Sequence, residues 1–278
     1  MFGILGDVVR VSHAIEAGKV QIQMIGFGVL KITSPNGKVI LTDPWLSAND
    51  FFLEGNPAVP EKYKKDVGAF SQVDIVLITH AHFDHLNLKD LVAICERFNP
   101  VVVAPVETAC YISSKVGLAE NICNGGFGMS RGPLAPIDGI QITGVHAEHT
   151  SSEVGVTEEG SLMVRDLGDS LGYIITLENG FKIYFSGDTG LCSDMKFIIG
   201  DYYQPDLVIL NICGGGFTVG GDSAAYAIQM IQPKYVIPAH YGVFEMMDQT
   251  PDEFLEALKQ RAPDVKAFTL QPEESVEF

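Results

Sequence analysis

The spacing of apolar residues predicts a series of short β-strands along most of the chain. Residues 21–25 alternate apolar and polar side chains, which is typical of a strand with one buried face. Residues 73–79 form an almost unbroken apolar run, which is typical of a strand buried on both faces. The same two patterns predict further strands at 29–33, 38–42, 101–104, 140–145, 173–177, 181–185, 206–210 and 235–238. Ser34-Pro-Asn-Gly37 and Glu178-Asn-Gly180 are turn sequences, so antiparallel hairpins are expected and a purely parallel sheet is not.

Helices are predicted between and after these strands. Asn87 is an N-cap residue with Asp90 at the third helical position, and apolar residues follow at helical spacing as far as Cys95. Further helices are predicted over 107–116, from Asp222 or Ser223 onward, and from the capping box Thr250-Pro-Asp-Glu253 through Leu258. Short strands in two groups, with helices between and after them, favour an α/β (α+β) fold with two mixed sheets flanked by helices.

Three segments fall outside this pattern. Residues 1–18 have the apolar spacing of a short helix, and residues 46–70 have the prolines and glycines of an irregular surface excursion. Residues 153–170 are rich in acidic side chains and are expected to form a solvated loop, with a lid or an oligomer contact as the alternatives. We therefore expect an N-terminal extension over 1–19 and a single domain over 20–278.

Composition narrows the class of protein. The chain has 278 residues, 46% of them hydrophobic, which is enough to build a large core and argues against disorder. A formal net charge of −17 argues against nucleic acid as a partner. No apolar run approaches the roughly 20 residues that cross a bilayer, and the N-terminus lacks the basic flank of a secretory signal. The five cysteines form no CxxC pair, which favours reduced thiols in the cytoplasm.

Histidines are few, and three of the seven lie in one short segment, His80-Ala-His-Phe-Asp-His85. This segment begins where a buried strand ends, so its side chains emerge together at a sheet edge. Imidazole nitrogens and carboxylates at about 2.0–2.2 Å are ligands for a divalent metal. The segment is therefore a candidate metal-binding turn.

Three further candidates also follow predicted strands. His149 follows strand 140–145, Asp188 follows strand 181–185, and His240 follows strand 235–238. Because the ends of neighbouring strands gather at one edge of a layered fold, we expect these side chains to join the histidine-rich turn.

The order His80-x-His82-x-Asp84-His85, then His149, Asp188 and His240, resembles the complete ligand set of the metallo-β-lactamase fold superfamily. The resemblance extends from about Val20 to about Leu258. Four further segments resemble one branch of this superfamily, the uncharacterised metal-dependent hydrolases related to the cytoplasmic ascorbate-6-phosphate lactonase. The segments are Asp43-Pro44-Trp45-Leu46, Gly187-Asp-Thr-Gly190 with Asp194-Met195, Gly214–Val219 and Pro238-Ala-His-Tyr-Gly242. The resemblance implies a four-layer αβ/βα sandwich with the metal site at one edge of the two sheets.

The resemblance also implies roles for the individual ligands. It assigns His80, His82 and His149 to a first metal, Asp84, His85 and His240 to a second, and Asp188 to a bridge between them. His146 is the alternative to His149, but Ala147-Glu-His149-Thr-Ser-Ser152 resembles the branch and favours His149. His13 lies before the matched region. Phe27 stands where several relatives carry a polar residue, so a polar role at that position is not expected.

These expectations lead to a metal-dependent hydrolase that opens a small lactone, ester or amide with a metal-bound hydroxide. Asp84 is the candidate proton shuttle, and Tyr241 is a second catalytic candidate that also contacts the substrate. Thr218 is a further substrate-binding candidate, because it lies in a glycine-rich segment ahead of a helix. One or two divalent ions are expected, zinc or manganese, with iron as an alternative because histidine and aspartate suit all three.

The same ligands leave other functions open. They are compatible with a phosphodiesterase acting on a small phosphodiester, with a mononuclear iron oxygenase, and with a non-catalytic metal-binding protein. A flavo-diiron partner is less favoured, since that pattern places Glu at the position of His82. The expected partners are a small-molecule substrate and further copies of the chain in a homo-oligomer, with no nucleic acid and no membrane.

Overall fold

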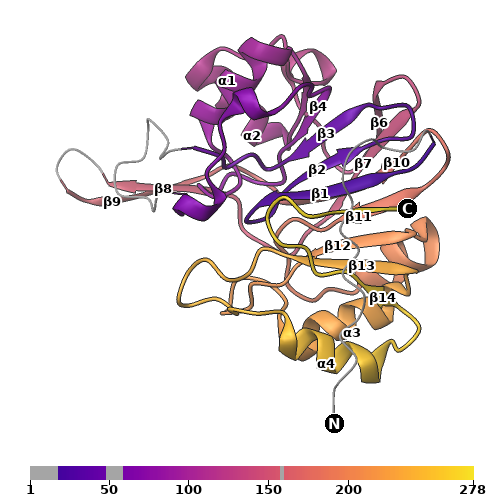
Figure 1. The fold of residues 1–278 in the computed structure, drawn as a ribbon. Coiled ribbons are helices and arrows are strands. Elements are labelled where there is room, and N and C mark those ends of the chain that lie inside the picture. The colour runs from indigo at the N-terminus through magenta and orange to yellow at the C-terminus, as the bar shows by residue number, and fades with distance from the viewer. Residues whose placement is uncertain (1–17, 48–58, 157–159) are drawn as a thin grey trace.

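Two β-sheets face each other, and helices cover their outer faces (Figure 1). The computed structural model describes residues 18–47, 59–156 and 160–278. The helix predicted within residues 1–18, the start of the predicted extension and part of the irregular segment 46–70 lie outside the described residues.

The first sheet has six strands in the order β15-β1-β2-β3-β4-β5. Its strands are β1 (Gln21–Gly26), β2 (Val29–Thr33), β3 (Val39–Thr42), β4 (Ile75–Leu77), β5 (Val101–Val103) and β15 (Ser275–Glu277). Strands β15, β1, β2 and β3 pair antiparallel, and β3, β4 and β5 pair parallel, so the sheet is mixed. Its outer face is covered by α1 (Leu88–Phe98) and α2 (Val106–Val116).

The second sheet has seven strands in the order β14-β13-β12-β11-β10-β7-β6. They are β6 (Gly132–Ile137), β7 (Ile140–His146), β10 (Leu171–Thr176), β11 (Lys182–Phe185), β12 (Leu207–Asn211), β13 (Tyr235–Ala239) and β14 (Lys266–Ala267). Strands β11 to β14 pair parallel and the others antiparallel. The helices outside it are the π-helix η4 (Met195–Tyr203), α3 (Gly221–Ile231) and α4 (Asp252–Arg261).

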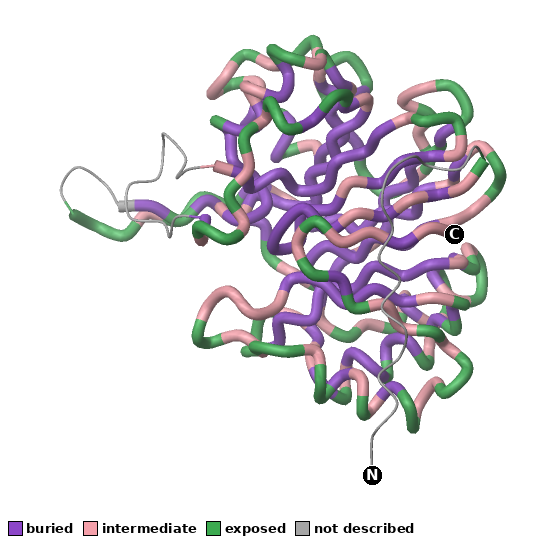
Figure 2. Tube along the Cα trace, viewed as in Figure 1, coloured by how far each residue is buried: buried purple, intermediate pink, exposed green. Residues whose placement is uncertain are grey.

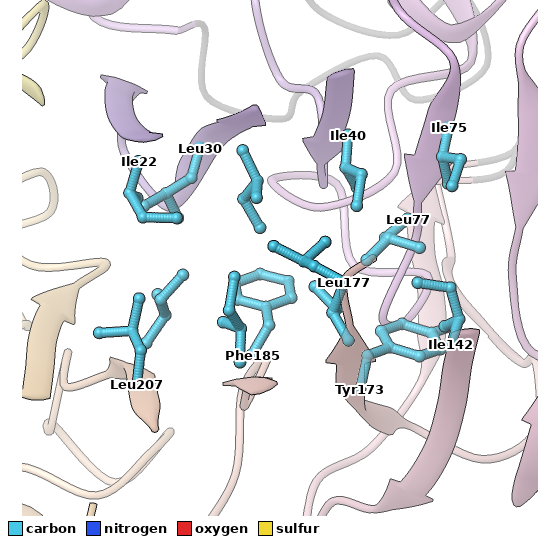
Figure 3. Close-up of a cluster of buried hydrophobic side chains, with 14 of the residues drawn as sticks. Ile22, Leu30, Ile40, Ile75, Leu77, Ile142, Tyr173, Leu177, Phe185 and Leu207 are labelled. Carbon is cyan, nitrogen blue, oxygen red and sulfur yellow. The ribbon is translucent and has the colours of Figure 1, made fainter. Parts of the chain in front are cut away.

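Apolar side chains fill three layers, which confirms the predicted four-layer αβ/βα sandwich. Between the sheets, Ile22, Leu30 and Ile40 of the first sheet point toward Phe185 and Leu207 of the second (Figure 3). Two outer layers join each sheet to its own helices. Figure 2 shows that burial is concentrated in the sheets and on the inner sides of the helices.

The predicted N-cap of α1 is confirmed, and two other local predictions are wrong. The Asn87 side chain accepts a hydrogen bond from the Asp90 backbone N–H at 3.0 Å. The predicted capping box at Thr250 does not form, because the Thr250 hydroxyl donates to the Asp252 carboxylate at 2.9 Å and the helix begins at Asp252. The strand predicted over 73–79 is shorter, because the backbone N–H of Thr79 donates to the carboxylate of Asp43 and not to a neighbouring strand.

The prediction of a solvated loop over 153–170 is also wrong. Residues Ser152–Val156 (β8) and Leu162–Asp166 (β9) pair as an antiparallel hairpin that projects from one end of the sandwich (Figure 1). Glu153 of β8 is buried, accepts a hydrogen bond from the Tyr111 hydroxyl at 2.8 Å and forms an ion pair with Arg165 at 3.0 Å. The acidic composition gave no sign of these two partners.

Several other elements were not predicted from the spacing of apolar residues, among them β6, β14, β15 and η4. Strand β14 has two residues and β15 has three, too few to show a period, and both depend on pairing with strands that are distant in sequence. None of the helices within residues 18–47, 59–156 and 160–278 has the length and apolar character needed to cross a bilayer.

Candidate metal centre

Seven side chains selected from the sequence meet at one edge of the two facing sheets. They lie in the loops that follow β4, β7, β11 and β13, so four strand ends deliver them to one place. They are His80, His82, Asp84, His85, His149, Asp188 and His240.

The first group is a triplet of histidines. His80, His82 and His149 each place a ring nitrogen within 4.8 Å of the other two. His80 Nε2 lies 2.9 Å from His82 Nδ1, and His149 Nε2 lies 3.2 Å from the same atom. The other nitrogen of His82 is 3.4 Å from the Ser152 hydroxyl, which leaves Nδ1 to face the other rings.

The second group is Asp84, His85 and His240, whose ligand atoms also lie within 4.8 Å of one another. His240 Nε2 is 3.5 Å from an oxygen of Asp84. The rings of His85 and His240 stack with their centroids 4.7 Å apart. All three side chains are buried, so the group forms the floor of the site.

Asp188 lies between the two groups. One carboxylate oxygen is 3.4 Å from His85 Nε2 and 3.8 Å from His149 Nε2, and the other is 3.9 Å from His240 Nδ1. The Asn211 side-chain amide donates to that second oxygen at 2.8 Å and fixes the carboxylate. This position is compatible with the bridging role that the family resemblance implies for Asp188.

Close packing fixes His240 from the side away from the other ligands. Its backbone has φ 61°, an unfavourable left-handed value for a non-glycine residue. The Phe27 ring lies against the imidazole, with centroids 3.9 Å apart. Gly28 has φ +67°, and a Cβ there would lie 2.8 Å from His240 Cδ2, so only glycine fits without displacing the histidine. The sequence gave no sign of these contacts.

Asp43 holds two of the histidines, although the sequence analysis gave it no role in the site. Its carboxylate accepts hydrogen bonds from the Thr79 backbone N–H and hydroxyl, both at 2.7 Å. The same Oδ2 accepts from His85 Nδ1 at 2.8 Å. Because the Thr79 hydroxyl donates to Asp43, it accepts from His80 Nδ1 at 3.0 Å. The Nε2 atoms of His80 and His85 are thereby left as acceptors toward the centre, as a metal site requires.

The pKa values of the histidines are shifted in opposite directions in the two triplets. Burial lowers the pKa of His80 well below 6.5, lowers that of His82 to about 4 and lowers that of His149. Burial opposes protonation of His85 and His240 as well, but Asp188 and other carboxylates raise the pKa of His85 well above 6.5 and that of His240 to about 10. The first triplet is neutral and ready to coordinate, whereas a metal at the second must displace protons.

Unpaired nitrogen atoms show that the donor set fits a metal. Among the described residues, His85 Nε2 and both ring nitrogens of His240 are buried without a hydrogen-bond partner. Leaving such an atom unpaired costs about 1–3 kcal/mol. Three histidines in one group, two histidines and a carboxylate in the other, and a shared carboxylate are a donor set for first-row divalent cations.

Two other side chains have to be compared with the cluster, His146 and Cys213. The ring of His146 interacts with Arg131 at 3.3 Å and Glu148 at 3.1 Å, so the structure brings His149 and not His146 to the other histidines. Cys213, which is not among the predicted ligands, is buried and places its sulfur within 4.8 Å of ligand atoms of Asp188 and His240.

A cavity of about 360 Å³ opens onto the cluster. Its polar wall consists of His82, Asp84, His149, Ser152 and Asp188. Its apolar wall consists of Phe83, Val154, Phe217, Phe244, Met246 and Met247. Ser152 and Val154 belong to the hairpin β8–β9, which the sequence analysis had treated as a loop.

The two predicted substrate-binding residues are not among the residues that line this cavity. The Thr218 hydroxyl accepts from the Gly214 N–H at 3.2 Å and donates to the Val219 carbonyl at 2.8 Å, so it is used within its own loop. Tyr241 packs with the outer layer of the second sheet and lines a separate small cavity of about 40 Å³. The glycine-rich loop contributes Phe217 to the main cavity instead.

The sequence is similar to a family model and to known proteins over the region that contains the cluster. Residues 38–241 match the model of the β-lactamase superfamily domain, a range that includes all seven side chains of the cluster. The chain is 38% identical over 267 residues to a UPF0173 metal-dependent hydrolase of Polynucleobacter asymbioticus, covering 94% of this chain and 87% of that protein. It is 36% identical over 255 residues to a UPF0173 metal-dependent hydrolase of a Roseiflexus species, covering 92% and 96%.

The fold is also similar to a solved structure. Igni18, a metallo hydrolase from the hyperthermophilic archaeon Ignicoccus hospitalis, superposes with a TM-score of 0.73 at 26% identity. The match covers 94% of this chain and 98% of Igni18, so it includes both sheets and their helices.

Proposed function

The chain belongs to the metallo-β-lactamase superfamily, among the UPF0173 metal-dependent hydrolases, and on this basis we propose that it hydrolyses a small lactone, ester or amide. The observation that carries the proposal is the pair of candidate ligand triplets, with Asp188 between them, beside an open cavity. A bound substrate there would lie directly against the ligands.

The residues have the following roles in this proposal. His80, His82 and His149 would hold a first divalent ion, Asp84, His85 and His240 would hold a second, and Asp188 would be available to both. Zinc or manganese is the expected metal, with iron as the alternative. When bound, such ions lower the pKa of water toward about 7 and polarise a carbonyl oxygen.

Asp84 is the proposed proton carrier as well as a ligand, because its side chain lies both in the second triplet and on the cavity wall. Burial alone would raise its pKa, but His85 and His240 hold that pKa below the ordinary value. The carboxylate is therefore ionised at neutral pH and is able to accept a proton from the attacking water. It would then pass this proton to the oxygen or nitrogen of the leaving group.

Replacing His82 tests the assignment. His82→Ala removes the atom on which His80 and His149 converge, so the variant is expected to lose bound metal and hydrolysis of an ester and lactone panel while keeping its circular dichroism spectrum. His146→Ala is the matched control, since His146 lies outside the cluster, and it is expected to keep both properties. Full activity in the His82 variant would overturn the assignment.

We further propose that the protein works as a homo-oligomer in the cytoplasm. All five cysteines are free, which supports a reducing compartment. Phe197 and Tyr202 of the π-helix are largely exposed aromatic side chains, which supports self-association. Light scattering on the purified protein tests whether it forms a homo-oligomer, and a monomer at all concentrations would contradict self-association.

A further inference from the structure

The cavity that opens onto the metal centre is lined by residues of two kinds. Part of its wall consists of candidate metal ligands, and most of the rest is formed by six apolar side chains from four separate segments of the chain. Phe83 lies within the histidine-rich turn, Val154 belongs to the hairpin, Phe217 to the glycine-rich loop, and Phe244, Met246 and Met247 to the segment after β13. A substrate held at the metal centre therefore extends along an apolar surface.

Three of these side chains remain exposed at the mouth of the cavity. Val154 is 42% exposed, Phe217 46% and Met246 64%. Large apolar side chains are stabilising when they are removed from water, so three of them left in water around one opening favour a ligand that covers them. The cavity volume of about 360 Å³ lies in the usual range for small-molecule sites, roughly 300–1,000 Å³.

No Lys or Arg is among the described residues that line the cavity, so these residues offer nothing to neutralise an anionic group away from the metal centre. Arg165, on the neighbouring strand of the hairpin, is held in its ion pair with the buried Glu153. The formal net charge of −17 adds to the repulsion of an anionic group.

We infer that the substrate carries an uncharged, apolar group next to the bond that is cleaved, and that Val154, Phe217 and Met246 select it. This inference rests on the proposed hydrolase function and narrows its substrate class. It favours aliphatic or aromatic lactones, esters and amides. It disfavours substrates with a remote phosphate or carboxylate, which includes phosphorylated lactones.

The chain contains its own reporter for binding at this wall. Trp45 is the single tryptophan, and its ring packs edge-on against Phe83 with centroids 5.8 Å apart. It also lies 6.2 Å from Phe244, centroid to centroid. Because Phe83 and Phe244 line the cavity, a ligand that contacts them is expected to change the fluorescence of Trp45.

The first experiment measures kcat/KM of the metal-loaded enzyme for p-nitrophenyl esters from acetate to hexanoate, and for the singly charged succinate half-ester. Burial of each methylene predicts a rise of about fourfold in kcat/KM, with the charged ester at or below the acetate level. Met246→Ala is expected to flatten the rise, and Met246→Lys to increase the rate with the succinate half-ester. Phe127→Ala, which changes an exposed aromatic residue ahead of β6 that does not line the cavity, is the control and is expected to match the unmodified enzyme.

The second experiment titrates the metal-loaded protein with hexanamide and with its analogue that ends in a sulfonate while Trp45 fluorescence is recorded. Binding of hexanamide at least tenfold tighter than that of the sulfonate supports the inference without relying on turnover. If esters are hydrolysed but the rate is independent of chain length and charge, the inference is overturned and the hydrolase function stands. If no ester or lactone is hydrolysed, the hydrolase function fails, and the fluorescence titration alone then decides whether the cavity prefers uncharged apolar groups.

Discussion

Replacing Asp43 by asparagine tests whether a buried carboxylate outside the ligand set controls metal binding. Asp43 is 2% exposed, and its Oδ2 accepts hydrogen bonds from both the Thr79 hydroxyl and His85 Nδ1. In Asp43→Asn the side-chain oxygen keeps the Thr79 backbone N–H, and an NH₂ group takes the place of Oδ2. This NH₂ group then faces two other hydrogen-bond donors, the Thr79 hydroxyl and His85 Nδ1–H. His85 must therefore rotate, or carry its proton on Nε2, the atom that faces Asp188.

The size of the effect follows from the bonds that are lost. A hydrogen bond to a charged group contributes about 1.5–3 kcal/mol, which corresponds to roughly 10- to 100-fold in an equilibrium constant. Removing the hydrogen-bond partner of a metal-binding histidine lowers metal affinity by a similar factor, about 10–100-fold. We therefore expect Asp43→Asn to weaken zinc binding by about 10–100-fold while the protein stays folded.

Competition with a chromophoric chelator measures this affinity, and thermal unfolding in the presence of the chelator measures stability separately. Asp74→Asn is the matched control, because Asp74 lies on the same sheet and accepts a hydrogen bond from the Val39 N–H at 2.8 Å but contacts no candidate ligand. It is expected to lower stability and to leave zinc affinity unchanged. Unchanged zinc affinity in Asp43→Asn, or an equal loss in both variants, would refute the reasoning.

Three further predictions concern other parts of the fold. Gly28→Ala is expected to lower the metal content after dialysis, because its Cβ would lie 2.8 Å from His240 Cδ2 at φ +67°; unchanged content by elemental analysis would contradict this. Tyr111→Phe removes the hydroxyl that donates to the buried Glu153, so the free energy of unfolding in urea is expected to fall by about 1–3 kcal/mol, and no measurable change would count against the hairpin contact. Burial raises the pKa of Cys95 to about 12, so only about one thiol in 10⁴ is ionised at pH 8. Iodoacetamide is therefore expected to leave Cys95 unmodified until the protein unfolds. Rapid alkylation of Cys95 in the native protein, seen by mass spectrometry, would contradict this.

The cluster was predictable from the sequence because its members all follow predicted strands. A histidine or aspartate at the end of a buried strand must emerge at a sheet edge, and local patterning alone is enough to place His80, Asp188 and His240 there. Asp43 also follows a strand, but its role depends on Thr79 and His85, which only the folded structure brings to it. Tyr241 was predicted to contact the substrate because it directly follows His240 in the sequence. Its side chain packs instead with the outer layer of the second sheet.

The apolar side of the site depends on contacts between distant segments and could not be predicted. Phe27 touches His240 across the interface of the two sheets. Val154 reaches the cavity because Glu153, its neighbour on β8, is anchored to α2 through Tyr111. Short strands such as β14 and β15 were missed for the same reason, since pairing with distant strands and not local periodicity forms them.

The most direct test of the metal centre is elemental analysis of the protein purified without added metal, beside a variant in which His80, His82 and His149 are all alanine. The account predicts about two divalent ions per chain in the natural protein and about one in the variant, because the second triplet and Asp188 remain. No bound metal in the natural protein, even after reconstitution with zinc, manganese or iron, would contradict it, as would two ions in the variant.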